Sequence, residues 1–289
     1  WLEKGSTHFC GLIAYLKNSC LEKDSIVNCD ETWCRVKREG CYKKKYIWCL
    51  VNKLSKVVVY CYEDGSRGRD ALKHILGDSQ VKALQSDGYN VYMYLDDHMV
   101  DIEHLCCMAH ARAKFKYAFE QGNDKDAAFI LELIGELYRL ERGYEEGKLS
   151  PEQIRLCRNN LKTKEIIIKL RSKLDALLSE HHPPRGELME KALNYMNTFW
   201  TQLFAYLNDG SYSIDNSIAE RFIRPLAGER KNSLFFGSDK MARVSAVYHT
   251  IISTCRMQGV SVLDYFKRFF SEIVKGRRDY EHLLPLTIG

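Results

Sequence analysis

The sequence predicts a mixed α/β fold that is interrupted by a long helical block. In the first third of the 289-residue chain, short runs rich in Val, Ile, Tyr and Trp alternate with polar links, which is typical of β-strands. A stretch with helical periodicity then covers residues 107–208. A chain of this length allows one large domain or two ordinary ones.

The first predicted elements follow from changes in the periodicity of the apolar residues. Residues 1–24 place apolar side chains on one face and predict a helix. Three strands are predicted at 25–36, 44–52 and 56–63, where β-branched and aromatic residues dominate. The polar link at Lys53–Ser55 predicts a hairpin between the second and third strands.

A helix and another strand complete the predicted sheet region. Residues 67–77 carry a helical pattern that Gly77 closes. Strand character resumes at Val81 and lasts until the Asp87-Gly88 break. Three antiparallel strands, a helix and a further strand together predict a mixed sheet.

The helical block has clear start and stop signals. Ser150-Pro151-Glu152-Gln153 combines a cap, a proline at the first helical position and a capping-box Gln. We expect one helix of about 30 residues from there to Pro183-Pro184. Another helix is expected over 186–207, ending at Asp209-Gly210.

The C-terminal part begins with a short helical segment, 217–224, that Pro225 is expected to stop. A basic segment follows at 228–240. Two helices are then predicted at about 240–257 and 261–275, with Gly259 between them and Ser261 as the second cap.

Composition excludes several classes of protein. The chain is 45% hydrophobic and 28% charged, close to the soluble globular average, which excludes disordered and collagen-like proteins. No apolar run approaches the roughly 20 residues that span a bilayer, so we expect no membrane partner. The chain begins with Trp1, and no basic segment leads into an apolar one, so we expect no signal peptide and a fragment of a longer protein.

Charge and cysteine content indicate which partners and which cellular compartment to expect. The net charge of +5 permits a polyanionic partner without requiring one. The 11 cysteines are odd in number and scattered through apolar runs. We therefore expect reduced thiols in a cytoplasmic protein.

Three acidic residues are candidates for chemistry. Asp30 interrupts a predicted strand, Asp87 ends another, and Glu220 lies in a short helix. Each also has an ordinary interpretation: a solvent-facing strand residue for Asp30 and a turn aspartate for Asp87. Glu220 fits a capping box with Ser217 or an ion pair with Arg224.

Two aspartates on strands and a glutamate on a later helix form the set that two-metal phosphoryl transfer requires. Carboxylate oxygens are the ligands that Mg²⁺ prefers. Two such ions activate the attacking oxygen and stabilise the leaving one. The spacings of 57 and 133 residues have no specificity of their own.

Five motifs give the sequence a family resemblance: CDETWCRV, LQSDGYNVY, CCMAHARAKF, SIDNSIAERFIRP and RKNSLFFGS. With these motifs in this order, the chain closely resembles transposases of the insertion-sequence-66 family, in the DDE group. The resemblance implies a ribonuclease-H-like core with a large helical insertion before the last catalytic acid. It predicts a lead-in at 1–24, core segments at 25–111 and 211–289, and an insertion at 112–210.

By position in these motifs, the resemblance implies Asp30, Asp87 and Glu220 as the catalytic residues. They would also hold two Mg²⁺ or Mn²⁺ ions. Asp215 competes for the third place because it lies five residues upstream, but the AER motif falls on Glu220.

Cys107-x-x-His110 has half of a zinc-site spacing, and His104 and Cys106 lie nearby. No second pair with zinc spacing follows it. The resemblance implies that Cys107 and His110 organise the active site, while metal binding and ordinary core packing remain alternatives.

Basic residues follow Glu220 closely. Arg221, Arg224, Arg230 and Lys231 are predicted to contact the DNA backbone, which positions DNA without determining its sequence. The alternative is a solvated face around a small apolar patch.

The function implied by the resemblance is metal-dependent DNA cleavage at insertion-sequence ends, followed by strand transfer to target DNA. A decayed DNA-binding remnant and a ribonuclease-H-like nuclease without strand transfer are the alternatives. Expected partners are element ends, target DNA, a second chain in a synaptic complex and accessory proteins of the element. We expect a cytoplasmic protein that associates with the nucleoid when it binds DNA.

Overall fold

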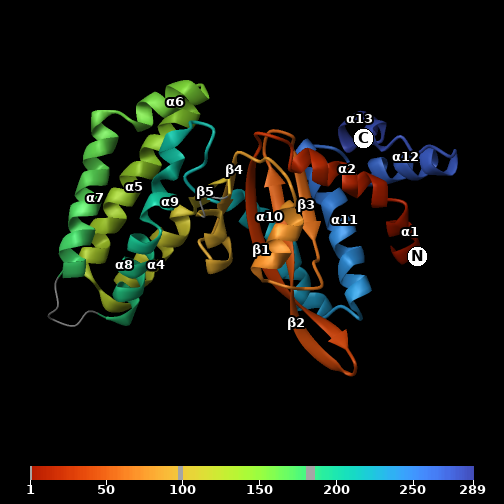
Figure 1. The fold of residues 1–289 in the computed structure, drawn as a ribbon, viewed down its shortest axis with the longest axis horizontal. Coiled ribbons are helices and arrows are strands. Elements are labelled where there is room, and N and C mark those ends of the chain that lie inside the picture. The colour runs from red at the N-terminus through yellow and green to blue at the C-terminus, as the bar shows by residue number, and fades with distance from the viewer. Residues whose placement is uncertain (1, 97–99, 180–185) are drawn as a thin grey trace. The chain divides into compact units, whose positions relative to one another are not determined.

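The computed structural model describes residues 2–96, 100–179 and 186–289 and divides into two compact units. We call the first the sheet unit; it comprises Trp1–Glu103 and Ile218–Gly289. We call the second the helical unit; it comprises His104–Ser217. Figure 1 shows the elements of both units along the chain.

A five-stranded mixed sheet has the order β3-β2-β1-β4-β5. β2 pairs antiparallel with both β1 and β3, whereas β4 runs parallel to β1. The boundary between the two units falls inside β5. The strand bounds are β1 Ile26–Arg38, β2 Cys41–Asn52, β3 Val57–Cys61, β4 Ala83–Ser86 and β5 Glu103–Cys106.

β1 and β2 form a long hairpin that projects beyond the shorter β3 (Figure 1). Its register runs from the pair Val27–Asn52 to the pair Arg38–Cys41. The two-residue turn consists of Glu39 and Gly40, with φ values of 47° and 81°. Positive φ at both central residues is typical of the tight turns that suit the twist of a hairpin.

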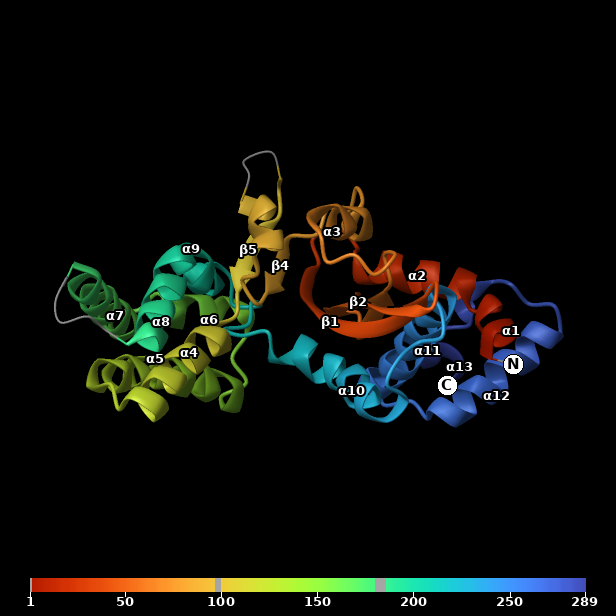
Figure 2. The ribbon, with the colours of Figure 1, turned by 90° about the horizontal axis from the view of Figure 1, so that it is seen from below.

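Helices cover both faces of the sheet in the sheet unit, with α2 and α3 on one face and α10 and α11 on the other (Figure 2). α10 begins at Ser217, one residue before the boundary of this unit. The helices are α1 Leu2–Thr7, α2 Cys10–Cys20, α3 Arg69–Leu76, η1 Asn90–Asp96, α10 Ser217–Ser233, α11 Asp239–Gln258, α12 Val262–Val274, η3 Tyr280–His282 and α13 Pro285–Ile288.

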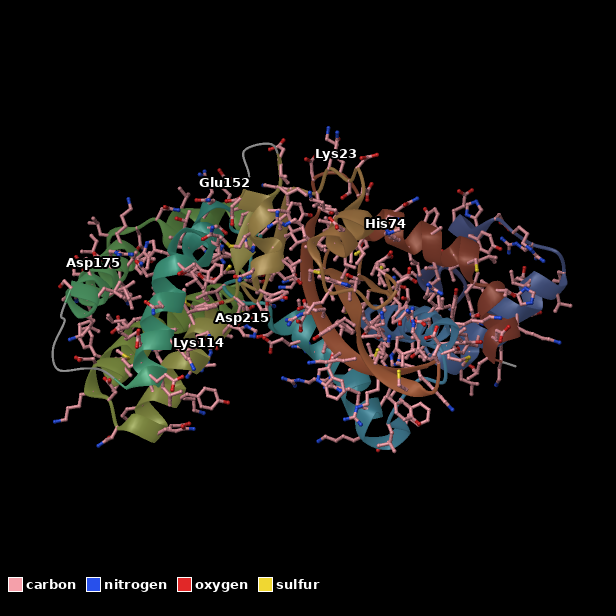
Figure 3. The ribbon with its side chains drawn as sticks, turned by 60° about the horizontal axis from the view of Figure 1, so that its bottom comes forward. Lys23, His74, Lys114, Glu152, Asp175 and Asp215 are labelled. Carbon is pink, nitrogen blue, oxygen red and sulfur yellow. The ribbon has the colours of Figure 1, made fainter. Side chains whose placement is uncertain are left out.

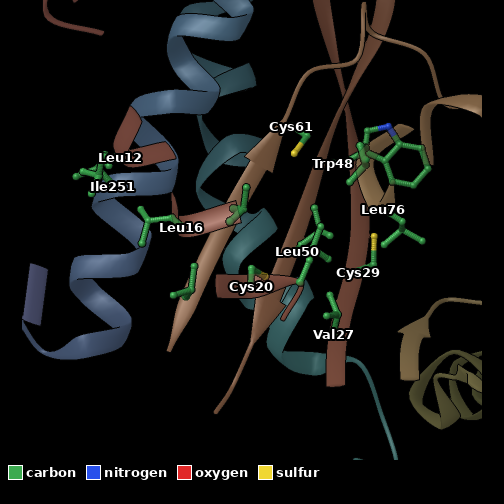
Figure 4. Close-up of a cluster of buried hydrophobic side chains, with 14 of the residues drawn as sticks. Leu12, Leu16, Cys20, Val27, Cys29, Trp48, Leu50, Cys61, Leu76 and Ile251 are labelled. Atoms are coloured by element: carbon green, nitrogen blue, oxygen red, sulfur yellow. The ribbon is translucent and has the colours of Figure 1, made fainter. Parts of the chain in front are cut away.

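Strand alternation divides the core of the sheet unit into two clusters. One contains Val27, Cys29, Trp48 and Leu50 packed against α2 and its neighbours (Figure 4). The cluster on the opposite face, under α10 and α11, has the members Cys34, Val36, Ile47, Cys49, Val51, Val58, Tyr60, Tyr62, Ala219, Ile223, Leu226, Ala242 and Ala246. Burying both faces fixes the register, because a one-residue slip would exchange them.

The helical unit is held partly by a buried ion pair between Arg158 and Glu141, with an N–O distance of 2.6 Å. Arg158 also donates to the carbonyls of Tyr206, Asp209 and Tyr212. Its helices are α4 Met108–Gly122, α5 Lys125–Glu146, α6 Pro151–Arg158, α7 Leu161–Ser179, α8 Glu187–Thr198, α9 Trp200–Phe204 and η2 Ala205–Asn208.

Several sequence predictions are confirmed. The mixed sheet, the three antiparallel strands and the β2–β3 hairpin are present. The Ser150–Gln153 capping box is formed in both directions. Gly259 ends α11 in the left-handed region, and Ser261 caps α12 through the N–H of Asp264.

Two predicted single helices are each broken in two. The N-terminal helix breaks at Phe9, which is fully buried and stacks on Phe269 at 4.5 Å. The helix after Pro151 ends at Arg158, and Asn160 accepts a hydrogen bond from the Thr163 N–H to start α7. The predicted stop at 183–184 lies outside the described residues.

The expectation that Pro225 stops its helix is wrong, since α10 continues to Ser233. Pro225 removes only its own N–H, and the carbonyl that loses this donor belongs to exposed Arg221. Ile223 and Leu226 on either side are buried against the sheet. That packing holds the helix across the proline.

Two expectations about the setting concern the thiols and the membrane. All eleven cysteines are free thiols, and the reduced state expected for them is open to mass measurement. Of the helices in the described segments, none is both long and apolar enough to cross a membrane.

Candidate active site

Asp30 and Asp87 follow a matched pair of side chains on neighbouring strands. Asn28 of β1 lies opposite Gln85 of the parallel β4. The Asn28 amide donates to the Gln85 side-chain oxygen at 2.9 Å. Since side chains two residues apart share a face, this register brings Asp30 and Asp87 to the same level of the sheet.

Asp87 also forms the local turn that its Asp-Gly sequence predicts. Its Oδ1 accepts a hydrogen bond from the Tyr89 N–H at 3.0 Å, and Gly88 has φ of 80°. β4 ends at Ser86, so Asp87 lies at the carboxyl end of the strand. The turn therefore fixes the backbone of Asp87 at the end of β4.

Glu220 lies in the first turn of α10, which packs on the face of the sheet that contains Asp30. Its neighbour Ala219 is fully buried in the same cluster as Cys49. Cys49 is the β2 residue directly opposite Asp30. The packing of α10 therefore brings Glu220 toward Asp30.

The electrostatics of Asp30 agree with this arrangement. Burial raises the pKa of the Asp30 carboxyl from 3.8 to about 8, with the charges of Glu31, Asp87 and Glu220 as further causes. The Glu31 N–H, which donates to Asp30 Oδ1 at 2.8 Å, lowers this pKa only in part. Acidic groups thus accumulate around Asp30 with too little positive charge to offset them.

Glu31 is a fourth carboxylate that we did not predict. Its side chain is 1% exposed and pairs with Arg67 at 2.6 Å, while Tyr92 donates to the other oxygen at 2.8 Å. Burial and then the charge of Asp87 raise the pKa of Glu31. The adjacent acids Asp30 and Glu31 could have marked Glu31 as a site candidate in the sequence. Its pairing with Arg67, 36 residues away, could not be predicted because only the fold brings the two together.

Cys107 and His110 lie in the helical unit. Cys107 is the N-cap of α4, is fully buried, and its Sγ accepts a hydrogen bond from the Asn216 N–H at 3.2 Å. His110 lies in the first turn of α4 and its N–H bonds the Cys107 carbonyl at 3.2 Å. These contacts fix Cys107 at the start of α4, and the expected role of Cys107 and His110 in organising the active site stays a prediction.

Asp215, the competitor for the third acidic position, is engaged within the helical unit. Tyr138 donates its hydroxyl to Asp215 Oδ2 at 2.9 Å, and the Ser217 N–H donates to Oδ1 at 3.0 Å. Both carboxylate oxygens therefore accept a hydrogen bond from a neighbour, which favours a role for Asp215 in starting α10.

The four predicted DNA-contact residues differ in their surroundings. Arg221, Arg224 and Lys231 are exposed on α10. Arg230 instead lies over the Trp33 ring at 4.2 Å and donates to the Thr32 hydroxyl and the Trp33 carbonyl. Arg230 therefore connects the end of α10 to β1. Contact with DNA stays a prediction, and it is favoured for the three exposed residues.

Comparisons with known proteins support a family assignment. Residues 1–244 match the family model described as "Transposase IS66 family". An uncharacterized protein named y4qI from Sinorhizobium fredii (strain NBRC 101917 / NGR234) is 32% identical over 238 residues, 79% of this chain and 43% of its own. Uncharacterized proteins y4jD and y4hP of the same strain are 27% and 31% identical, covering 79% and 70% of this chain and 45% and 38% of their own. The chain thus spans less than half the length of these curated relatives.

Proposed function

The chain belongs to the IS66 transposase family, and on that premise we propose that it carries the catalytic centre of a DDE-type DNA transposase. The reaction would be metal-dependent DNA cleavage at insertion-sequence ends, followed by strand transfer to target DNA. The observation that supports this best is the pairing of Asn28 with Gln85 on adjacent parallel strands, two residues before Asp30 on β1 and Asp87 at the end of β4, with Glu220 on the neighbouring α10. The mixed sheet with helices on both faces supports a ribonuclease-H-like core.

The donor set fits divalent cations. Asp30, Asp87 and Glu220 offer hard carboxylate oxygens, the ligand type that Mg²⁺ and Mn²⁺ prefer. The raised pKa of Asp30 reflects burial first and then the negative charges of its acidic neighbours, which a cation would offset. In this proposal these three residues hold two Mg²⁺ or Mn²⁺ ions. When bound, such ions would supply activation of the attacking oxygen and stabilisation of the leaving oxygen.

The chain's own groups prepare the site. Asp30 carries a proton near neutral pH in the absence of a cation, and that proton must leave its carboxyl before the oxygen can act as a ligand. Arg67 and Tyr92 hold Glu31 in place, so its charge stays beside Asp87. Glu31 thereby shapes the field at the site while its own oxygens are engaged.

DNA and protein partners belong to the same proposal. Exposed Arg221, Arg224 and Lys231 follow Glu220 on α10 and would contact phosphates beside the cleaved bond. Element ends and target DNA would be the substrates, with a second copy of the chain and accessory proteins in the synaptic assembly. The enzyme would work in the cytoplasm on nucleoid DNA.

The test compares Glu220→Gln with Glu229→Gln, the same substitution nine residues later on α10. DNA cleavage and joining are measured with Mg²⁺ or Mn²⁺ on duplexes that carry element ends. We expect Glu220→Gln to lose both steps by about 100-fold or more, because a metal carboxylate contributes several kcal/mol to the barrier reduction. DNA affinity should change little, and Glu229→Gln should behave like the unmutated protein.

Each other result has a defined meaning. Near-normal strand transfer by the Glu220→Gln variant would exclude Glu220 from the catalytic set and make Asp215 the next residue to test. Cutting without joining would support a nuclease. Binding of element ends with no cutting by the unmutated protein would support a decayed remnant.

A further inference from the structure

The outer part of the β1–β2 hairpin concentrates the positive charge of the chain. We call residues 35–45 the hairpin tip. It contains six basic side chains and one acidic side chain, a net charge of +5, which equals the net charge of all 289 residues. The rest of the chain is therefore neutral overall, and the tip is its strongest attraction for a polyanion.

The two faces of this hairpin differ. On one face, Cys34 and Val36 are buried in the cluster under α10. The backbone of Phe236 bridges the edge of β1 beside Val36. The opposite face has three cross-strand pairs, and we call it the ribbon face. Its residues are Trp33, Arg35, Lys37, Tyr42, Lys44 and Tyr46. The ribbon face contacts the rest of the sheet unit through its rings: Trp33 lies under Arg230, Tyr46 under Arg67, and Tyr42 against Phe235 at 4.6 Å between ring centroids. Its cations stay at the surface.

The cations of the ribbon face are not neutralised. Arg35, Lys37 and Lys44 are exposed, and within the described parts of the chain none of them has a carboxylate within 4 Å. Arg38 on the other face, in contrast, is paired with Asp239. The ribbon face itself contains no acidic residue. Its positive charge is therefore available to a partner.

Aromatic rings hold two of these cations in place. Lys44 lies 5.7 Å from the Trp33 ring and 5.6 Å from the Tyr46 ring, and Arg35 lies 6.0 Å from Trp33. A ring restricts a long side chain by attraction to its π face but leaves the net charge unchanged. An ion pair would restrict it equally and cancel the charge. The arrangement suits binding of anions in a row.

We propose that the ribbon face binds the phosphate backbone of duplex DNA. Charge complementarity selects a polyanion, and a two-stranded ribbon has dimensions that fit the major groove or the adjacent backbone. The ring faces are already occupied by cations, since Arg230 covers Trp33 and Arg67 covers Tyr46. Phosphate contact by Arg35, Lys37 and Lys44 is therefore favoured over stacking of bases.

The ribbon face begins three residues along β1 from the proposed catalytic Asp30, on the opposite face of the strand. Trp33 follows Glu31 by two residues on the same face of β1, a rise of about 7 Å. DNA bound along the strand would lead away from the acidic site, so this inference rests on the proposed function. It adds a second contact surface to the predicted one on α10.

The experiment compares two triple variants of the protein. Arg35→Gln, Lys37→Gln and Lys44→Gln remove the ribbon charges. Lys4→Gln, Lys23→Gln and Lys267→Gln remove three exposed charges elsewhere in the sheet unit; Figure 3 labels Lys23, which points outward. Affinity for a 30-base-pair duplex is measured by fluorescence anisotropy over a range of salt concentrations.

We expect the ribbon variant to bind roughly tenfold or more weakly, with a log–log salt slope shallower by about 2.7, or 0.9 for each phosphate that the variant no longer neutralises. The control variant should keep the slope of the unmutated protein. Equal weakening in both variants, or an unchanged slope in the ribbon variant, would overturn the inference and leave the proposed function standing. If the unmutated protein binds no duplex at low salt, both proposals fail.

A footprint tests the surface without relying on a variant. Lysine acetylation is followed by mass spectrometry with and without the duplex. Lys37 and Lys44 should be protected, whereas Lys23 and Lys267 should react at the same rate in both samples. Protection that spares the ribbon lysines would assign DNA to another surface.

Discussion

The two halves of β1 place opposite charges in opposite environments. The inner half, Val27–Glu31, is packed between β2 and β4 and holds two carboxylates with little solvent. The outer half, Trp33–Arg38, extends beyond β4 and has exposed cations at Arg35 and Lys37. One strand thus joins a buried acidic site to an exposed basic surface.

The difference follows from what each half loses on folding. A carboxylate in the inner half gives up hydration and gains acidic neighbours, so its pKa rises as that of Asp30 does. An exposed cation in the outer half, such as Arg35 or Lys37, keeps its hydration. The inner half therefore suits strong binding of a small cation. The outer half suits binding of a polyanion, which salt weakens by screening the exposed charges.

The largest expected effect is in the inner half. Asp30→Asn keeps the size of the side chain but removes a metal ligand from the proposed site. We expect DNA cleavage to fall by about 100-fold or more, with DNA binding retained. Cleavage of a supercoiled plasmid with Mn²⁺ measures this, and exposed Asp70→Asn on α3 is the control. Full cleavage by Asp30→Asn would remove Asp30 from the catalytic set.

The next effect concerns stability. Arg67→Met takes the guanidinium partner from Glu31, whose side chain is 1% exposed and also accepts from the Tyr92 hydroxyl. We expect a loss of about 1–3 kcal/mol in the free energy of unfolding, the cost of leaving a buried polar group unsatisfied. The control is Arg243→Met, because Arg243 pairs with Asp64 on the surface, where such pairs contribute about 0–1 kcal/mol.

Urea unfolding of the two variants gives the comparison directly. If Arg67→Met lowers the free energy of unfolding no more than Arg243→Met does, the buried and the exposed ion pair contribute equally to stability. The contrast between the two halves of the strand would then not extend to their ion pairs.

The pH dependence has a defined sign. The folded-state pKa of Asp30 is about 8 against 3.8 for the free side chain, so the folded protein binds more protons between these values. Without divalent cations, stability should therefore be greatest below this window, fall as pH rises through it, and level off above it. Thermal unfolding in EDTA measures the trend, and Asp30→Asn should flatten it. A fall in stability that is as steep in Asp30→Asn as in the unmutated protein would contradict the assignment to Asp30.

Sequence patterns predicted what local signals control. The strands around Val27 and Leu50 and the cap at Ser150 follow from alternation and capping chemistry within a few residues. The four-residue strand β5 was not predicted, since Glu103–Cys106 is too short to show a period. The continuation of α10 through Pro225 depends on packing that no local pattern contains.

The candidate site shows the same limit. The motifs of the family resemblance selected Asp30, Asp87 and Glu220, and their catalytic role stays a prediction. The partnership of Glu31 with Arg67 and Tyr92 depends on segments 36 and 61 residues away. The ribbon face likewise depends on cross-strand register, which places Arg35 beside Lys44. Spatial pairing of this kind is a property of the fold and not of one segment.

The smallest expected effect separates the position of charge from its amount in the outer half. Trp33→Leu removes the ring beside Arg35, Lys44 and Arg230 but leaves every charge. The freed cations must then be ordered when DNA binds, at a cost of about 0.5–1 kcal/mol, the value of an exposed cation–π contact. Affinity should fall about two- to fivefold, with the salt slope unchanged because the number of phosphate contacts is the same. Trp200→Leu removes a similar ring, next to Arg171 in the helical unit, and should leave affinity unchanged. A shallower slope in Trp33→Leu would mean that the ring itself maintains a phosphate contact, and unchanged affinity would mean that the rings do not prepare this surface for DNA.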